Sequence, residues 1–385
     1  MDTAAEHHVE EHERTVTPFE LFFDLIFVFG FTQVTTLMAG EPTARGVLRG
    51  MLVLAAIWWA WGAYVWLATT IDPEQDATRL VWFGVMGAML VAALAVPNAF
   101  GRYASVFAVC YLIVRTLHLA LYALAARGMP ALLRNVLLLA PSTMASGLLI
   151  LGASFLETGL REVIWIIAIG IDYLGPALYD ASGWELSPRH FVERHGLIFL
   201  IALGESIVAL GLAASHLQLD ARTIIATMLG LTVVVAMWWT YFDVVAIVAG
   251  RRLEQAPEKD QGAMARDSYS YLHMPMVAGV ILFALGVKTA LPDLTTSLDL
   301  TPAAALCGGL TVYLVAHILF RIRNVHSINR PRTVAAAASA ALVAVSQQVS
   351  GLVLLALVAA VAVTLVTYET VVYREARTRV RASHH

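Results

Sequence analysis

Long runs of apolar residues follow one another along the whole chain, and short polar segments separate them. Each run is close to the length of about 20 residues that a helix needs to cross the hydrocarbon core of a bilayer. Few charged residues fall inside the runs. The pattern predicts twelve membrane-spanning helices, at residues 19–39, 47–69, 80–97, 103–126, 132–153, 162–180, 196–214, 223–249, 269–290, 302–320, 333–349 and 351–373.

The composition supports the same class of protein. Of the 385 residues, 59% are hydrophobic and 14% are charged, whereas about a quarter of the residues in soluble domains are charged. Residues 1–18 lack the basic start and the small-residue cleavage site of a signal peptide, so we expect the first span to stay uncleaved. We therefore predict an all-α fold, a polytopic membrane helix bundle whose main partner is the lipid bilayer.

Basic residues are distributed unevenly between the two sides of the predicted bundle. Segments on the side of the N-terminus carry 18 Lys and Arg residues, and segments on the opposite side carry 5. Loops rich in Lys and Arg stay in the cytoplasm. We therefore expect a multi-pass protein of the cytoplasmic (inner) membrane with both termini in the cytoplasm. A net charge of −3 and the lack of a basic patch with interleaved aromatic residues argue against a nucleic-acid partner.

The two halves of the chain share an order of motifs. Glu13–Arg14 precedes the first span, and Trp58–Trp59 lies in the second. Glu193–Arg194 and Trp238–Trp239 repeat this order 180 residues later. The equal spacing predicts an internal repeat.

A later match extends the repeat, because the segment from Tyr111 to Arg115 resembles the segment from Tyr313 to His317. Six spans per half is an even number, so both halves would have one orientation, as in transporters built from parallel repeats. The predicted organisation is an acidic tail at 1–18, a six-span repeat at 19–180, a linker at 181–195, a second six-span repeat at 196–373 and a basic tail at 374–385.

Several ionisable residues lie inside predicted spans, where a charge costs on the order of 2.5–3.5 kcal/mol. Glu20 and Asp24 are four residues apart and share one face of the first span. Such residues usually face a protein interior or a wet cavity. The candidate residues for binding an ion, a proton or a substrate are Glu20, Asp24, Glu205, Asp172, Asp243, Arg115, His118 and His317.

Two interpretations of these residues stay open. In the functional one, a cluster of carboxylates and histidines binds a cation or relays protons. Asp24 and Glu205 are central to it, because they take adjacent positions in the two repeats and could share a cation. In the structural one, charge pairs such as Arg115 with Asp172 or Glu205 hold the helices together.

Motifs for catalysis are missing from the sequence. There is no GxGD, no serine nucleophile turn, no Walker motif, no GxGxxG and no haem motif. Cys110 and Cys307 have no CxxC or His neighbour at ligand spacing, and the His7, His8 and His12 group reads as a solvated tail. We therefore expect no enzyme activity, no cofactor and no metal site.

Four segments together resemble the bacterial low temperature requirement A family. They are Arg14-x-x-Thr17-Pro-x-Glu20-Leu-Phe-Phe-Asp24-Leu-x-Phe-Val-Phe29, the Trp58–Trp59 span, Glu193-Arg-His-Gly196 and Ala202-Leu-Gly-Glu-Ser-Ile207. The resemblance covers nearly the whole chain. It implies a polytopic protein of the cytoplasmic membrane, but the family's name records a growth phenotype in the cold and implies no substrate.

A second similarity concerns the first span alone. Glu20-x-Phe22-Phe-Asp24-x-x-Phe27 is similar to the ExFSDxxF motif of the lysosomal potassium channels and their bacterial relatives, which are also built from six-span repeats. Phe23 stands where that motif has Ser, and the second half of the chain lacks the motif. The similarity implies passage of an ion without assigning a gate.

These observations favour a transporter or channel-like permease for a small cation or a proton-coupled solute. The alternative is a non-transporting membrane sensor or scaffold with structural intramembrane charges. A membrane enzyme acting on a lipid or quinone is a third class. The substrate, the choice between channel and carrier, and a homo-oligomeric state stay open.

Overall fold

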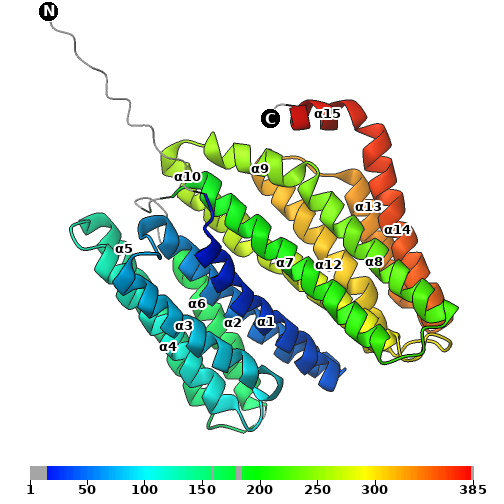
Figure 1. The fold of residues 1–385 in the computed structure, drawn as a ribbon, viewed down its shortest axis with the longest axis horizontal. Helices are drawn as coiled ribbons and strands as arrows, with labels where there is room; N and C mark the ends of the chain where they lie inside the picture. Colours follow the sequence, from blue (N-terminus) through cyan, green and yellow to red (C-terminus); the bar gives the residue numbers. More distant parts are fainter. Residues whose placement is uncertain (1–14, 158, 179–183, 185, 383–385) are drawn as a thin grey trace, which may run out of the picture.

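The computed structural model of the chain describes residues 15–157, 159–178, 184 and 186–382. Regular secondary structure in this part of the chain is helical throughout (Figure 1). The histidines of the N-terminal tail and the Glu13–Arg14 pair lie outside the described residues. The first bundle contains α1 (Pro18–Gly40), α2 (Ala44–Thr70), α3 (Asp76–Ala95), the 3₁₀ turn η1 (Val96–Asn98), α4 (Ala104–Ala125), α5 (Pro130–Ala153) and α6 (Leu160–Leu178).

The second bundle starts with α7, which begins two turns before the seventh predicted span. Proline occupies the first turn of α7, where its missing N–H costs no helical hydrogen bond. The elements are α7 (Pro188–Ser215), α8 (Ala221–Phe242), α9 (Val245–Glu254), α10 (Glu258–Ala265), the π-helical η2 (Arg266–Tyr271), α11 (His273–Ala290), α12 (Leu300–Val325), α13 (Arg330–Val345), α14 (Gly351–Val372) and α15 (Arg374–Ala382).

Ten helical segments among the described residues are long and apolar enough to cross a membrane. The predicted sixth and eleventh spans correspond to α6 and α13, which do not reach that standard. Helix α6 carries three charged residues, Arg161, Glu162 and Asp172, and α13 has only 16 residues. The structure therefore supports a multi-pass membrane protein, and the count of twelve spans stays a prediction.

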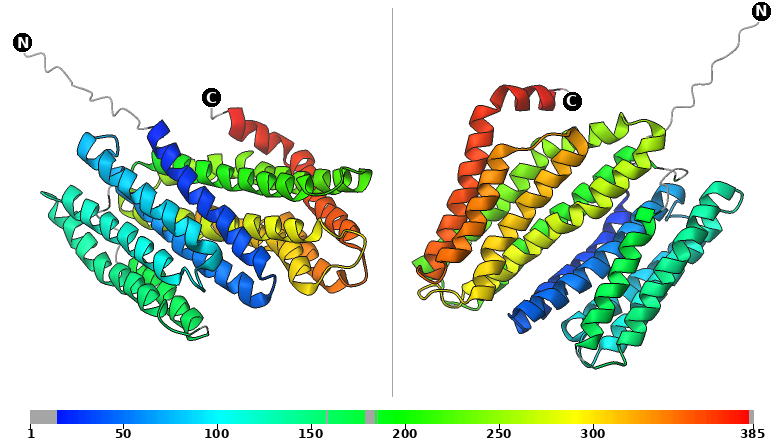
Figure 2. Two further views of the ribbon diagram at one scale, coloured as in Figure 1. Left: turned by 60° about the horizontal axis from the view of Figure 1, so that its bottom comes forward. Right: turned by 180° about the vertical axis from the view of Figure 1, so that it is seen from behind.

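The two bundles lie side by side, joined mainly through α1, which packs on α7 and α11 (Figures 1 and 2). Helix α2 also contacts α7 and α11 at this junction. The start of α1 and the C-terminal α15 lie at one end of the molecule, together with α9 and α10 (Figure 1). We call this end the terminal side.

The packing inside the two bundles follows a common scheme. In the first bundle α1 contacts α2 and α3, α4 contacts α3 and α5, and α6 contacts α5 and α2. In the second bundle α7 contacts α8 and α11, α12 contacts α11 and α13, and α14 contacts α13 and α8. The tightest pair is α11 with α12, where a Cβ on Gly279 would lie 2.6 Å from the backbone nitrogen of Tyr313. Small residues allow such close contact between membrane helices.

The π-helical segment η2 ties the second bundle to the first. The backbone N–H of Leu272 donates to the carbonyl of Asp267, five residues earlier, as in a π-helical turn. Ser270 accepts two hydrogen bonds from α2, one at its carbonyl from Trp58 Nε1 (2.8 Å) and one at its hydroxyl from Trp66 Nε1 (3.0 Å). One residue of the irregular turn therefore fixes both indoles.

Candidate functional site

A buried ionic network lies at the junction of the bundles, and we call it the junction network. It joins Glu20 and Asp24 on α1 to His190 and Arg194 on α7, and all four side chains are fully buried. The Arg194 guanidinium bridges both acids, with Nη1 3.1 Å from Glu20 Oε1 and Nη2 2.5 Å from Asp24 Oδ1. His190 Nε2 lies 2.9 Å from Glu20 Oε1, and Trp61 Nε1 donates to Asp24 Oδ1 at 2.8 Å.

Matching helical spacing on the two helices produces this arrangement. Glu20 and Asp24 are one turn apart on α1, as are His190 and Arg194 on α7. Helix α1 begins with a capping box that holds Glu20, whose Oε2 accepts the backbone N–H of Thr17 at 3.0 Å. A planar guanidinium can bridge two carboxylates in this way. Glu20 and Asp24 thus make buried ion pairs that join α1 to α7.

A second ion pair lies inside the first bundle, between α4 and α6. Arg115 Nη2 is 2.7 Å from Asp172 Oδ1, and both side chains are almost fully buried. Tyr111 donates its hydroxyl to Asp172 Oδ2 at 3.3 Å, and Arg115 also donates to Thr143 Oγ1 at 3.2 Å. Of the two partners expected for Arg115, the structure thus selects Asp172 and not Glu205.

The second bundle contains a larger network, which links α12, α13 and α14. Arg332 Nε donates to Glu369 Oε1 and Arg332 Nη2 to Glu369 Oε2, each at 2.8 Å. Its Nη1 lies 2.9 Å from Nδ1 of His317. Asn329 donates to Glu369 at 2.8 Å. The sequence analysis singled out His317 but missed Arg332, which precedes the predicted eleventh span. It also missed Glu369, which lies near the end of the last one.

Asp243 lies at the terminal side, where α8 ends. Arg377 Nε is 2.5 Å from Asp243 Oδ2 and Arg381 Nη2 is 2.7 Å from its Oδ1, so this acid holds α15 against the bundle. The hydrogen bond to Asp243 raises the pKa of the Arg377 guanidinium above its ordinary value, so that side chain stays charged. The structure gives Asp243 an anchoring contact with the C-terminal tail.

Glu205 differs from the other acids of the candidate set. Its carboxylate is mostly buried and interacts with the Thr32 hydroxyl of α1, and no described cation lies within ion-pair distance. Thr32 is eight residues beyond Asp24, or about 12 Å along α1. The structure therefore does not bring Asp24 and Glu205 together, and the expectation that they share a cation has no support in their geometry.

A cavity opens beside the Arg115–Asp172 pair, between the first bundle and η2. It offers about 90 Å³ to the centres of water molecules, roughly six to nine waters if each needs about 10–15 Å³ by this measure. Its wall includes Trp58, Trp59, Trp66, Trp184, Arg266 and His118. Trp184 comes from the segment before α7, Arg266 from η2 and His118 from α4.

His118 is a buried histidine in the wall of the cavity. Its ring is 1% exposed and stands edge-on to Tyr64 and Tyr122, each with centroids 5.5 Å away. Neither ring nitrogen makes a hydrogen bond of ordinary geometry, although the carbonyl of Ala63 acts on the ring. Buried polar atoms normally have partners, so this side chain indicates a place where a ligand or water completes the structure.

Comparison with known proteins places these features in a family. The family model described as "Bacterial low temperature requirement A protein (LtrA)" matches residues 15–367. The chain belongs to the LtrA family. It is also 31% identical over 290 residues to the "Uncharacterized protein RA0937" of Rhizobium meliloti (strain 1021). This match covers 72% of this chain and 70% of that protein. No solved structure matches.

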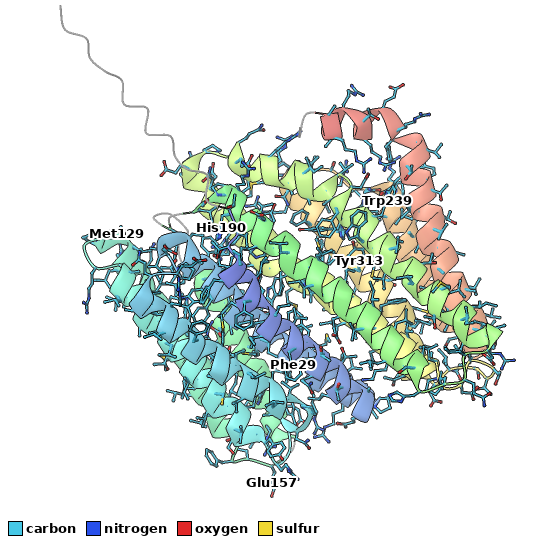
Figure 3. The ribbon with its side chains drawn as sticks, viewed as in Figure 1. Phe29, Met129, Glu157, His190, Trp239 and Tyr313 are labelled. Atoms are coloured by element: carbon cyan, nitrogen blue, oxygen red, sulfur yellow. The ribbon has the colours of Figure 1, made fainter. Side chains whose placement is uncertain are left out.

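The family assignment gives the junction network additional meaning. The segments on which the chain resembles the LtrA family include Glu20 and Asp24 in one and Arg194 in another, and these residues meet at the junction. His190, which contacts Glu20, is labelled in Figure 3. Sequence reasoning placed Arg194 in a cytoplasmic linker. One signal in the sequence could have identified Arg194. Glu20 and Asp24 are four residues apart, as are His190 and Arg194, and both pairs lie near the start of a helix on the same side of the molecule.

Proposed function

We propose that this LtrA-family protein is a membrane permease that carries a small solute across the cytoplasmic membrane. The observation that carries the proposal is the cavity between the bundles. Its wall contains the buried histidine His118 and Arg115, the cation of a buried ion pair. Concave sites with apolar walls and a few convergent polar groups are typical of ligand binding. Ionisable residues within membrane bundles commonly line solute or ion pathways.

Two arguments bear on what is carried. None of the described residues that line the cavity is Asp or Glu, which disfavours a small cation as the solute in this cavity. Glu205 is a buried acid that makes no described ion pair, although the charge of Lys288 acts on it, so it is the candidate to exchange a proton. The proposal is therefore a proton-coupled solute carrier, without ATP hydrolysis or enzyme chemistry.

The arrangement of the halves supports a carrier mechanism. The corresponding helix pairs pack in both bundles, as expected for two parallel six-helix repeats. We propose that the bundles rock about the junction, and that the excess of basic residues on the terminal side places both termini in the cytoplasm. The cavity would then face the cytoplasm in this conformation.

The scaffold alternative explains part of the same structure. Glu20, Asp24, Asp172 and Asp243 all lie in ion pairs that join helices, and such pairs suffice for a purely structural bundle. They leave the cavity, His118 and Glu205 unexplained. The permease proposal accounts for those three features.

Flux from purified protein tests the proposal. Liposomes loaded with a pH-sensitive dye and given an inside-negative potential should acidify faster with the wild-type protein than without protein, with and without a mixture of amino acids and organic acids outside. Glu205→Gln should reduce this rate to the protein-free level, because it removes the titrating group. The matched control is Glu258→Gln, which changes an exposed acid on α10 and should leave the rate unchanged.

Equal rates for wild-type and protein-free liposomes under every condition would contradict the permease proposal and favour the scaffold. Wild-type flux in a folded Glu205→Gln variant would contradict the role of Glu205 alone. The melting temperature of each variant, measured in the same detergent, separates a loss of flux from a loss of folding.

A further inference from the structure

The walls and polar groups of the cavity define a class of ligand. We propose that the cavity binds a planar aromatic carboxylate, that is, an organic anion with a ring. This inference deepens the proposed function by naming the class of solute, but binding itself does not depend on transport.

The walls of the cavity offer ring surface rather than hydrogen bonds. The indole N–H groups of Trp58 and Trp66 are already bound to Ser270, at 2.8 and 3.0 Å. Trp59 stacks on Tyr173 with centroids 4.1 Å apart, and Trp66 meets Trp184 edge-on at 6.0 Å. A flat apolar group packs well against such walls, because aromatic rings favour stacked and edge-to-face contacts.

The unused polar groups of the cavity are nitrogens. Arg115 directs two of its nitrogens at Asp172, Thr143 and the Trp59 carbonyl, and its Nε has no partner. His118 has no ordinary hydrogen bond at either nitrogen. A carboxylate supplies two acceptor oxygens, and hydrogen bonds to a charged partner are stronger than neutral ones. A carboxylate can therefore accept a hydrogen bond from Arg115 Nε, and a second one from the single N–H of a neutral His118 ring when that N–H is not bound to the Ala63 carbonyl.

Arg266 lines the cavity and belongs to a positively charged cluster with Arg323, which lies outside the lining. Arg266 and Arg323 share one carboxylate, with each Nε about 3 Å from an oxygen of Asp267 (2.9 and 3.0 Å). Two guanidinium groups facing one acid leave a net charge of about plus one. This charge attracts an anion and repels a cation.

Other ligand classes fit less well. An organic cation would gain from the indole faces, but it would meet the guanidiniums of Arg115 and Arg266 without a carboxylate among the described lining residues. A neutral ring would leave Arg115 Nε and His118 unsatisfied, and unsatisfied buried donors are costly. The volume of the cavity suits a single ring with one small substituent, not a lipid.

Three probes of one shape separate these classes: benzoate, neutral benzamide and cationic benzylammonium. Binding is measured on the purified full-length protein in nanodiscs by calorimetry and by the change in tryptophan fluorescence. Benzoate should bind about tenfold or more tightly than either of the other two, as expected for a charge-assisted hydrogen bond.

Two variants locate the site. His118→Phe keeps the ring packing and removes both nitrogens, so it should weaken benzoate binding about tenfold and leave benzamide binding nearly unchanged. Arg115→Lys keeps a positive charge opposite Asp172 but removes Nε and the planar fork, so it provides the same test if His118→Phe does not fold. His216→Phe, at an exposed position after α7, is the matched control and should bind benzoate like the wild type.

Benzamide or benzylammonium binding as tightly as benzoate would overturn the inference, as would wild-type benzoate affinity in a folded His118→Phe or Arg115→Lys variant. Failure of benzoate to bind at millimolar concentration would also overturn it. Benzoate binding without any liposome flux would support the inference and contradict the permease. Flux without benzoate binding would support the permease and contradict the inference.

Discussion

The two bundles each bury an arginine–carboxylate pair, but they use the arginine differently. In the second bundle every nitrogen of Arg332 is engaged, by Glu369, His317 and the Thr240 carbonyl. In the first bundle Arg115 keeps Nε free, and a cavity lies beside it. Arg115 in the first bundle therefore keeps a free donor for a further hydrogen bond, whereas Arg332 in the second bundle has none.

The source of the cation explains the difference. Tyr111 and Arg115 on α4 occupy the places of Tyr313 and His317 on α12 in the sequence match. Where the first bundle has arginine on this helix, the second has histidine and draws its guanidinium from α13 instead. The hydrogen bond between Arg332 and His317 adds a contact between α13 and α12 near Tyr313, whose ring lies 4.5 Å from that of His317 (Figure 3 labels Tyr313). A buried ion pair alone thus does not indicate a binding site. A hydrogen-bond donor without a partner beside a cavity, such as Arg115 Nε, does.

Breaking the Arg115–Asp172 pair should have the largest effect on stability. Arg115→Gln leaves Asp172 buried without its cation, and removing one partner of a buried pair typically costs about 3–5 kcal/mol. We expect a large fall in melting temperature in detergent. Adding Asp172→Asn to the variant should recover part of the loss, because no charge is then left unpaired. Equal melting temperatures for the single and double variants would show that the charge pairing does not matter.

Breaking the second pair should cost less. In Arg332→Gln, Glu369 keeps the hydrogen bond from Asn329 and its side chain is 14% exposed, so we expect a loss of about 2–3 kcal/mol. Benzoate binding, measured in parallel, should be unaffected, because Arg332 belongs to the other bundle. A loss of benzoate binding in a folded Arg332→Gln protein would contradict the division between a saturated pair and a pair with spare donors.

The smallest effect is expected where an ion pair reaches the surface. Asp243→Asn removes the ion pairs of this acid with Arg377 and Arg381. Because Asn keeps one acceptor oxygen and the Arg381 side chain is 55% exposed, we expect a loss of about 1–2 kcal/mol. Hydrogen exchange of residues 374–382 should accelerate while the exchange of α8 stays unchanged. Glu375→Gln, on the same helix, is the control. Unchanged exchange in α15 would show that Asp243 does not anchor the tail.

Hydropathy predicted the helical membrane bundle, because a helix that crosses lipid must be apolar along its length whatever it packs against. The same reasoning allowed Arg115 to be paired with Asp172, since a buried charge requires a partner at a similar depth. It could not identify Arg194 as the partner of Glu20 and Asp24. That contact depends on α7 beginning at Pro188 and on how the two bundles meet.

The cavity was also beyond the reach of sequence reasoning. His118 was selected because it lies in a span, but its lack of a partner depends on the placement of α2, α4 and η2 around it. For Glu205 the sequence suggested a contact that the structure does not have. Its position in the repeat, next to that of Asp24, indicated that the two acids lie close together, whereas Glu205 meets α1 at Thr32, eight residues beyond Asp24. Local spacing predicts contacts within a helix, and contacts between bundles follow from packing.

Deleting a single residue from η2 would let the chain close into an ordinary α-helix. Each residue of an α-helix turns the chain by about 100°, so the deletion would swing Arg266 around the helix axis and away from the indoles held by Ser270. The bundle itself would persist, because α11 and α12 make far more contacts with each other than with this turn. A family member one residue shorter here would therefore keep the architecture and lose the cationic rim, so indel variation at this turn is a natural route to altered solute preference.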